Sequence, residues 1–327
     1  MQDWVLESEK EDHLGDSFVA RTFKQPSPVI HTTLIHHIAN PNADKAILYI
    51  HGYTDYFFQA GLAEYFISLG YRFYAIDLRG YGRSIRPYRP PTWCESISEY
   101  IDDLDLALAT IKQDGIAETI VLAHSTGALI SANYLAKKQQ APSLDNDDKQ
   151  TLSTVTGLIF NSPFLALPFS PQQIKWLKKP VKAIVSSFPS GVIKTNKPIV
   201  YAKSLHSQFE GEWDYRLDWK PENGFGLSLH WLNEIIRAQE WLATQTLNIP
   251  TLLCRSEVST ISKKSVGDMQ QGDGVLHVES MEEAVKNTFD NLTIKVIPKG
   301  FHDLYLSKEP AQQAYLQTMS DWLTEQD

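Results

Sequence analysis

Cysteine is scarce in this chain: only Cys94 and Cys254 occur among 327 residues. Two cysteines support neither a disulfide framework nor a cysteine-based metal site. The chain also lacks an uncharged apolar run long enough to span a membrane, and its acidic first ten residues lack the apolar stretch of a signal peptide. These absences favour a globular protein of the reducing cytoplasm.

Positive charge is also in short supply, since 30 Lys and Arg stand against 39 Asp and Glu for a net charge of -9. Nucleic-acid binding needs a basic face, so we expect no nucleic-acid partner. Residues 79–84 lack both the G-x-G-x-x-G pattern and the lysine of a phosphate-binding loop, which argues against nucleotide binding. His36 and His37 would point to opposite faces of a strand, so they do not favour a metal site.

Short apolar, β-branched runs alternate with helical patterns along much of the chain, which predicts a mostly parallel, doubly wound α/β sheet. The expected strands are 17–23, 31–38, 45–50, 71–78, 119–123, 155–160, 250–255 and 292–297, and the expected helices are 58–69, 96–114, 126–138 and 309–325. Residues 139–153 are polar and rich in turn-forming residues, so we expect an exposed loop there.

This alternation stops between residues 164 and 243, a stretch rich in aromatics with ten Lys or Arg against seven Asp or Glu. We interpret it as a mainly helical cap, inserted over the carboxyl edge of the sheet where such folds hold ligands. The predicted organisation is therefore a first core part (1–163), a cap (164–243) and a second core part (244–327).

The sequence Ala123-His-Ser-Thr-Gly127 lies between an expected strand and an expected helix. A turn from strand to helix this abrupt needs small flanking residues, exposes the serine Oγ, and aims the helix N-terminus at the same point. It is typical of the nucleophile elbow of α/β-hydrolases and makes Ser125 the candidate nucleophile. The alternative is that Ser125 merely caps the helix.

A serine nucleophile needs a base, an orienting acid and donors for the oxyanion. His302 is the only histidine after the last expected strand, where this fold carries its base. His51 and Gly52 follow the strand 45–50 and lead into a loop. In an α/β-hydrolase this loop supplies one N–H of the oxyanion hole, and the residue after the nucleophile supplies the other. The N–H groups of Tyr53 and Thr126 are therefore the expected oxyanion donors. Alternatively, Gly52 only turns the chain.

The acid is harder to choose from the residues alone. Glu257 follows the strand 250–255 within a few residues, and Asp273 stands before the next helix. We prefer Asp273, keep Glu257 as the alternative, and rank Asp268 third.

Four stretches together resemble the monoacylglycerol lipase and lysophospholipase-like branch of the α/β-hydrolases, often grouped with serine aminopeptidases. They are Tyr49–Tyr53, Ala75–Ser84, Ala123–Gly127 and Gly300–Asp303. The resemblance implies an α/β-hydrolase fold and places the acid in an Asp-x-Val-Val-Asp-Pro-like stretch, which Asp273-Gly-Val-Leu-His-Val278 matches and Glu257 does not. The chain departs from the pattern at Ala123, usually glycine, and at His277, where aspartate is common.

These features predict a serine esterase acting on a small-molecule ester with an apolar acyl group, such as an acylglycerol or a lysophospholipid. The scheme requires no cofactor and no metal. An amidase or aminopeptidase using the same residues, and a non-catalytic binding protein, remain the alternatives. The lysines of the cap beside apolar residues could also make transient contact with a lipid surface, and the alternative is that they form a solvated face.

Overall fold

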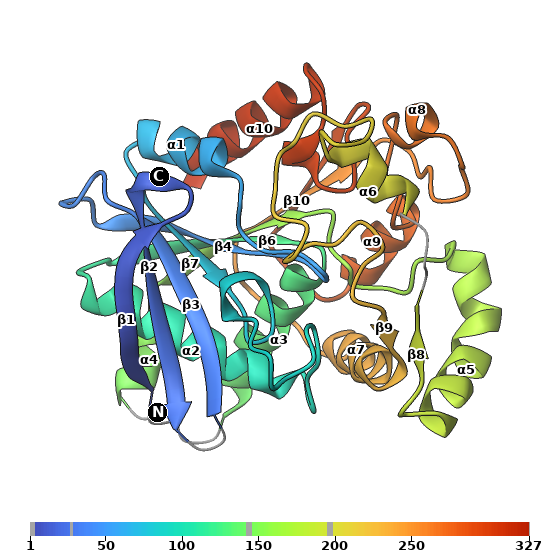
Figure 1. The fold of residues 1–327 in the computed structure, drawn as a ribbon, viewed down its shortest axis with the longest axis horizontal. Coiled ribbons are helices and arrows are strands. Elements are labelled where there is room, and N and C mark those ends of the chain that lie inside the picture. Colours follow the sequence, from blue (N-terminus) through green and yellow to red (C-terminus); the bar gives the residue numbers. More distant parts are fainter. Residues whose placement is uncertain (1–3, 27–28, 142–145, 195–198, 327) are drawn as a thin grey trace.

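The computed structural model describes residues 4–26, 29–141, 146–194 and 199–326, and its centre is a nine-stranded sheet in the order β1-β2-β3-β5-β4-β6-β7-β10-β11 (Figure 1). Strands β1, β2 and β3 are antiparallel to their neighbours. The other six strands of this sheet, β5, β4, β6, β7, β10 and β11, run parallel to one another. The strands are β1 (Val5–Asp12), β2 (Gly15–Pro26), β3 (Val29–His37), β4 (Lys45–Ile50), β5 (Arg72–Asp77), β6 (Glu118–His124), β7 (Val155–Asn161), β10 (Thr251–Ser256) and β11 (Leu292–Ile297).

Helices cover both faces of this sheet, which explains why its central strands are continuously apolar. In β4, Leu48 packs into the core on one face with α2 (Ser98–Gln113) and α3 (Thr126–Gln140). Tyr49 packs into the core on the other face with α1 (Ala60–Ser68) and α10 (Ala311–Gln326). The predicted class, a mostly parallel α/β sheet, is confirmed.

Between β7 and β10, the chain leaves the sheet, and we call this insertion, residues 164–243, the cap (Figure 1). Helix α5 begins with a capping box in which Ser170 and Gln173 bond each other's backbone. The short strands β8 and β9 pair antiparallel, and α7 packs against both α5 and α3. The elements of the cap are α5 (Pro171–Ser187), β8 (Val192–Ile193), α6 (Val200–Leu205), β9 (Leu227–Ser228) and α7 (Leu229–Leu242).

Two short 3-10 helices, η1 (Gly82–Ser84) and η2 (Leu304–Leu306), follow β5 and β11, while α8 (Val266–Met269) and α9 (Val278–Val285) connect β10 to β11. Helix α9 adds apolar side chains to the same core as α2 and α3. No helix within the described ranges combines the length and the hydrophobicity needed to cross a membrane.

Helix α4 and strand β1 differ from the sequence-based expectation. Residues 146–153, expected in an exposed loop, form helix α4 (Asn146–Ser153). Leu152 is the one apolar residue in its sequence, so no apolar periodicity predicted this helix. Strand β1 was not predicted either. It is a charged edge strand whose residues are nearly all exposed, and such strands carry little hydrophobic pattern.

Candidate active site

Ser125 is the single residue between the end of β6 and the start of α3. Its backbone has φ 52° and ψ -114°, a sparsely populated combination for a residue with a side chain. Both backbone groups are held by neighbouring segments: its N–H donates to Asn161 O at 3.0 Å, and its carbonyl accepts from Phe164 N at 3.0 Å. These bonds hold the tight turn that the sequence Ala123–Gly127 predicted.

The small residues on either side of Ser125 are required by close packing of the backbone. A Cβ on Gly127 would lie only 2.6 Å from Ile50 O and 2.7 Å from His51 O, so α3 touches the end of β4 directly. Ala123 is fully buried between its strand partners Ile50 and Phe160. An alanine methyl group fits there, which accounts for the departure from glycine.

A continuous hydrogen-bonded chain links Ser125 to two side chains far away in the sequence. His302 Nε2 lies 3.0 Å from Ser125 Oγ, and His302 Nδ1 lies 2.9 Å from Asp273 Oδ2. Ser125, His302 and Asp273 are 7%, 4% and 0% exposed, so the hydrogen bonds that link them are shielded from bulk water. With Nδ1 protonated, His302 can accept the serine proton at Nε2.

Asp273 is oriented by its own backbone surroundings. Its second oxygen, Oδ1, accepts from Val275 N at 2.8 Å and Leu276 N at 2.7 Å, which leaves Oδ2 for the imidazole. Glu257 and Asp268 are both exposed, and neither contacts His302. Of the three carboxylates considered from the sequence, Asp273 is the one beside His302.

The two segments expected to supply oxyanion donors both flank Ser125. A Cβ on Gly52 would lie 3.1 Å from Ser125 Cβ, so the chain leading to Tyr53 passes directly beside the serine. Thr126 is the first residue of α3, and the first N–H groups of a helix have no partner within it. Both segments that carry the predicted donors therefore lie beside the serine.

Several neighbours of His302 were not singled out from the sequence. The His124 ring lies 4.9 Å from the His302 ring, and complete burial lowers the pKa of His124, which favours the neutral form. Tyr201 of the cap places its ring 5.9 Å from His302, and its hydroxyl accepts from Asp303 N at 3.0 Å. His124 and Asp303 adjoin predicted site residues, but no pattern pointed to Tyr201.

Asp55, His124 and Asp303 form a buried group whose ligand atoms lie within 4.8 Å of one another, in the part of the chain that the structure describes. Lys220 of the cap places its Nζ 2.6 Å from Asp55 Oδ1, so the chain itself supplies a cation there. Asp303 accepts from Asn161 Nδ2 at 2.8 Å. The carboxylates are thus paired with side chains of the protein.

A cavity of about 450 Å³ opens elsewhere, between α5, α7 and α9. Its walls include Leu165, Ile174, Lys175, Lys178 and Leu242, and none of the three linked residues lines it. This cavity is therefore separate from the candidate site formed by Ser125, His302 and Asp273.

A family described as serine aminopeptidase, S33, matches residues 41–309. The chain belongs to this family. The match includes the elbow, both segments beside it and the two partners of Ser125, and the suspected branch of the α/β-hydrolases is confirmed.

Solved structures similar to this S33-family chain share its α/β-hydrolase fold. A soluble variant of monoglyceride lipase from Saccharomyces cerevisiae has 16% identity and a TM-score of 0.63, with 100% of this chain and 98% of that chain covered. A monoacylglycerol lipase from Paleococcus ferrophilus has 14% identity and a TM-score of 0.58, covering 86% and 95%. Mouse alpha/beta hydrolase domain-containing protein 10 has 13% identity and a TM-score of 0.55, covering 91% and 96%. No curated protein sequence matches the chain.

Proposed function

We propose that this S33-family hydrolase cleaves carboxylic esters through an acyl-enzyme on Ser125. His302 takes the serine proton as Oγ attacks the acyl carbonyl, and Asp273 holds the imidazole in the required tautomer. The N–H groups of Tyr53 and Thr126 bind the oxyanion. His302 then protonates the leaving alcohol, and water releases the acyl group. No step in this scheme needs a metal or a cofactor.

One observation carries the proposal: the hydrogen-bonded chain from Ser125 Oγ through His302 to Asp273, with distances of 3.0 Å and 2.9 Å. A serine that merely capped a helix would bond backbone N–H groups near the start of that helix. Ser125 makes no side-chain capping bond to α3, and its hydroxyl faces the imidazole instead. This arrangement favours nucleophilic chemistry over a structural role.

An ester of an apolar acyl group, such as an acylglycerol or a lysophospholipid, is the proposed substrate. The names of two structural neighbours, both lipases of monoacylglycerols, support this class, whereas the name of the family supports a peptide substrate. The Tyr53 ring packs on that of Trp231 with centroids 4.0 Å apart, which brings an aromatic pair to the loop that follows Gly52.

The ester proposal is tested by measuring kcat/KM on p-nitrophenyl esters from acetate to palmitate and on aminoacyl p-nitroanilides. We expect hydrolysis of the esters, with a preferred chain length that reports the depth of the acyl site. Faster cleavage of the anilides would favour an aminopeptidase that uses the same residues. A folded protein inactive on both classes would favour a non-catalytic binding protein.

We further propose that α5 contacts an anionic lipid surface. Trp176 and Ile184 in α5, and Phe188 at its C-terminal cap, are 82%, 56% and 64% exposed. Trp176 and Ile184 are eight residues apart, which places them about a quarter turn from each other around the helix. Lys175, Lys178, Lys179 and Lys182 lie on the adjoining side, where Lys178 and Lys182 also contact Glu240 of α7, while Val185 packs into the cap. An exposed apolar side next to lysines is suited to the boundary between headgroups and acyl chains.

Co-sedimentation with vesicles tests this surface. Wild-type protein is expected to bind phosphatidylcholine vesicles that contain phosphatidylglycerol and to bind pure phosphatidylcholine more weakly. The double substitution Trp176→Ser/Phe188→Ser should lower the bound fraction several-fold. Ile38→Ala, at an apolar residue 54% exposed but outside the cap, serves as the control. Equal binding by the wild type and the double variant would contradict the proposal.

A further inference from the structure

The loop after β4, residues 53–58, includes Tyr53 and makes several contacts with the cap. The Tyr53 hydroxyl donates to Gly226 O at 2.7 Å, and its ring packs on Trp231 of α7. The Tyr56 hydroxyl accepts from Arg216 N at 2.7 Å. Gly226, Arg216 and Trp231 all belong to the cap, so the loop contacts the cap through Tyr53 and Tyr56.

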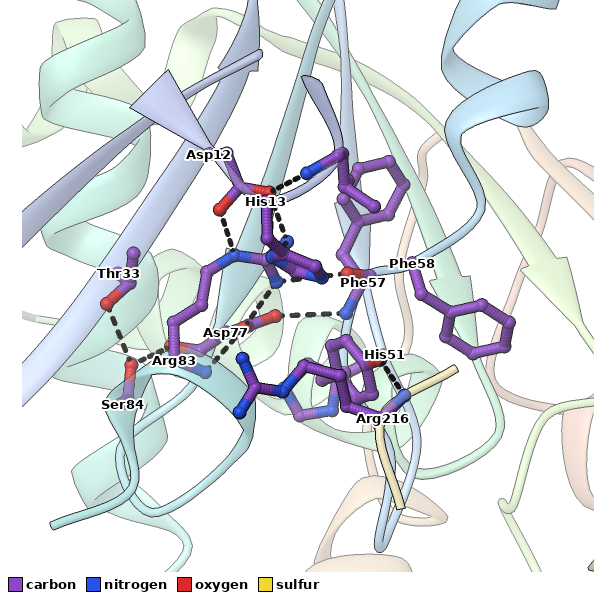
Figure 2. A network of polar contacts seen from close by, with 12 residues as sticks. Asp12, His13, Thr33, His51, Phe57, Phe58, Asp77, Arg83, Ser84 and Arg216 are labelled. Carbon is purple, nitrogen blue, oxygen red and sulfur yellow. Dashed lines mark hydrogen bonds and ion pairs between the residues drawn. The ribbon is translucent and has the colours of Figure 1, made fainter. Parts of the chain in front are cut away.

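The inner end of this loop is fixed by the core. Asp77 Oδ1 accepts from Phe57 N at 3.0 Å, and Arg83 Nη1 donates to Phe57 O at 3.0 Å. Figure 2 shows Arg83 between Asp12 and Asp77, with Phe57 beside them and Arg216 of the cap nearby. Each of these hydrogen bonds of Tyr53, Tyr56 and Phe57 has a side chain as its donor or acceptor. Side chains therefore set the position of the loop between Gly52 and Phe57.

Among these side chains, Asp55 makes the strongest tie to the cap. It is only 2% exposed, and Lys220 Nζ lies 2.6 Å from its Oδ1. The ammonium also lies 5.0 Å from the ring centroid of Phe58 and 5.3 Å from that of Tyr215. Burial by itself would raise the pKa of Asp55, but the charge of Lys220 lowers it below its ordinary value, so the carboxylate is ionised.

We propose that Lys220 is a positioning residue for the oxyanion site: by holding Asp55, it places the Tyr53 N–H beside Ser125. This inference rests on the proposed esterase function. It assigns to one lysine of the cap a role in the chemical step.

Loss of Lys220 leaves the Asp55 carboxylate buried without its cation, which strongly disfavours the present loop conformation. Asp55 Oδ2 has no hydrogen-bond partner among the described residues, so no second bond keeps the carboxylate in place once Lys220 is removed. The loop shifts, and the Tyr53 N–H two residues earlier moves with it. The Tyr53 N–H then bonds the oxyanion of the transition state less well, whereas ground-state binding of the acyl group changes little.

The test uses Lys220→Met, with kcat, KM and the Ki of an aliphatic trifluoromethyl ketone as readouts, because the tetrahedral adduct of the ketone places an oxyanion between the same donors. We expect kcat to fall by roughly tenfold to a hundredfold, less than the full loss of one donor. KM should stay within about threefold, and the affinity for the ketone should fall in parallel with kcat/KM. Lys220→Arg should restore most of the activity.

Lys138→Met is the matched control. Lys138 has nearly the same side-chain exposure as Lys220 (14% against 13%), contacts Asp105 at 2.8 Å, and lies over the ring of Tyr134, near the far end of α3. It should keep wild-type kinetics. The double variant Asp55→Asn/Lys220→Met covers the case in which Lys220→Met fails to fold, because it buries no unpaired charge. It still lacks the contact between the loop and the cap, so kcat should fall in the same direction but by less.

The role of Lys220 is overturned if these variants keep the wild-type kcat and affinity for the ketone, or if only KM changes. A wild-type protein that hydrolyses no ester contradicts the proposed function instead, so the two failures are distinct.

Discussion

Replacing Asp273 with asparagine is expected to lower kcat for ester hydrolysis by about 10⁴-fold while KM changes little. Asparagine can still accept the Val275 and Leu276 N–H groups through its carbonyl oxygen, which turns its NH₂ group toward His302. A donor in that place favours the tautomer with the proton on Nε2, and that tautomer cannot accept the Ser125 proton. Steady-state kinetics on the preferred p-nitrophenyl ester measure the effect.

Glu257→Gln is the control for this prediction, because Glu257 is the other carboxylate that the sequence offered. It is exposed, so its removal should leave kcat unchanged. Circular dichroism would show that both variants are folded. A large loss of activity in Glu257→Gln with little loss in Asp273→Asn would contradict the assignment of the acid.

Arg83→Met is expected to lower the free energy of unfolding by about 3–5 kcal/mol, because it leaves two buried carboxylates without the cation that pairs with them. Arg83 contacts Asp12 Oδ2 at 2.6 Å and Asp77 Oδ2 at 2.8 Å, and both carboxylate side chains are at most 3% exposed (Figure 2). Urea unfolding at pH 7 measures this loss. Arg237→Met, in an exposed ion pair with Glu234, should cost no more than about 1 kcal/mol.

The loss should depend on pH in a defined direction. Burial alone would raise the pKa of Asp12, but its bonds to Arg83 and His13 hold that pKa well below the ordinary value. A lowered carboxyl pKa stabilises the fold above about pH 4, and the stabilisation is lost as the pH falls further toward the folded-state value. The wild type should therefore lose more stability than Arg83→Met between pH 5 and pH 3. Parallel pH dependence in the two proteins would contradict this account of Asp12.

The sheet could be predicted from the sequence because its parallel strands are buried on both faces and are therefore apolar throughout. The turn at Ser125 was predictable for a related reason: the close approach of Gly127 to Ile50 and His51 restricts which residues fit. His302 followed from chain order alone. Choosing Asp273 over Glu257 needed the resemblance to a family, because each follows β10 and loop geometry decides which one reaches the imidazole.

The contacts between the cap and the core could not be predicted. Lys220 and Asp55 are 165 residues apart, and Tyr201 reaches Asp303 from a helix of six residues. Such contacts follow no periodicity, since each depends on how an irregular segment lies over the sheet. The sequence suggested that the cap was a separate insertion, but it carried no sign that the cap also holds the loop beside Ser125.

The most direct test of the account is the activity of Ser125→Ala on the ester that the wild type prefers. If Ser125 is the nucleophile, kcat should fall by on the order of 10⁴–10⁶-fold in a protein that remains folded. A fluorophosphonate should also label the wild type at Ser125 and leave the variant unlabelled. Ester hydrolysis at the wild-type rate by folded Ser125→Ala would contradict the central claim.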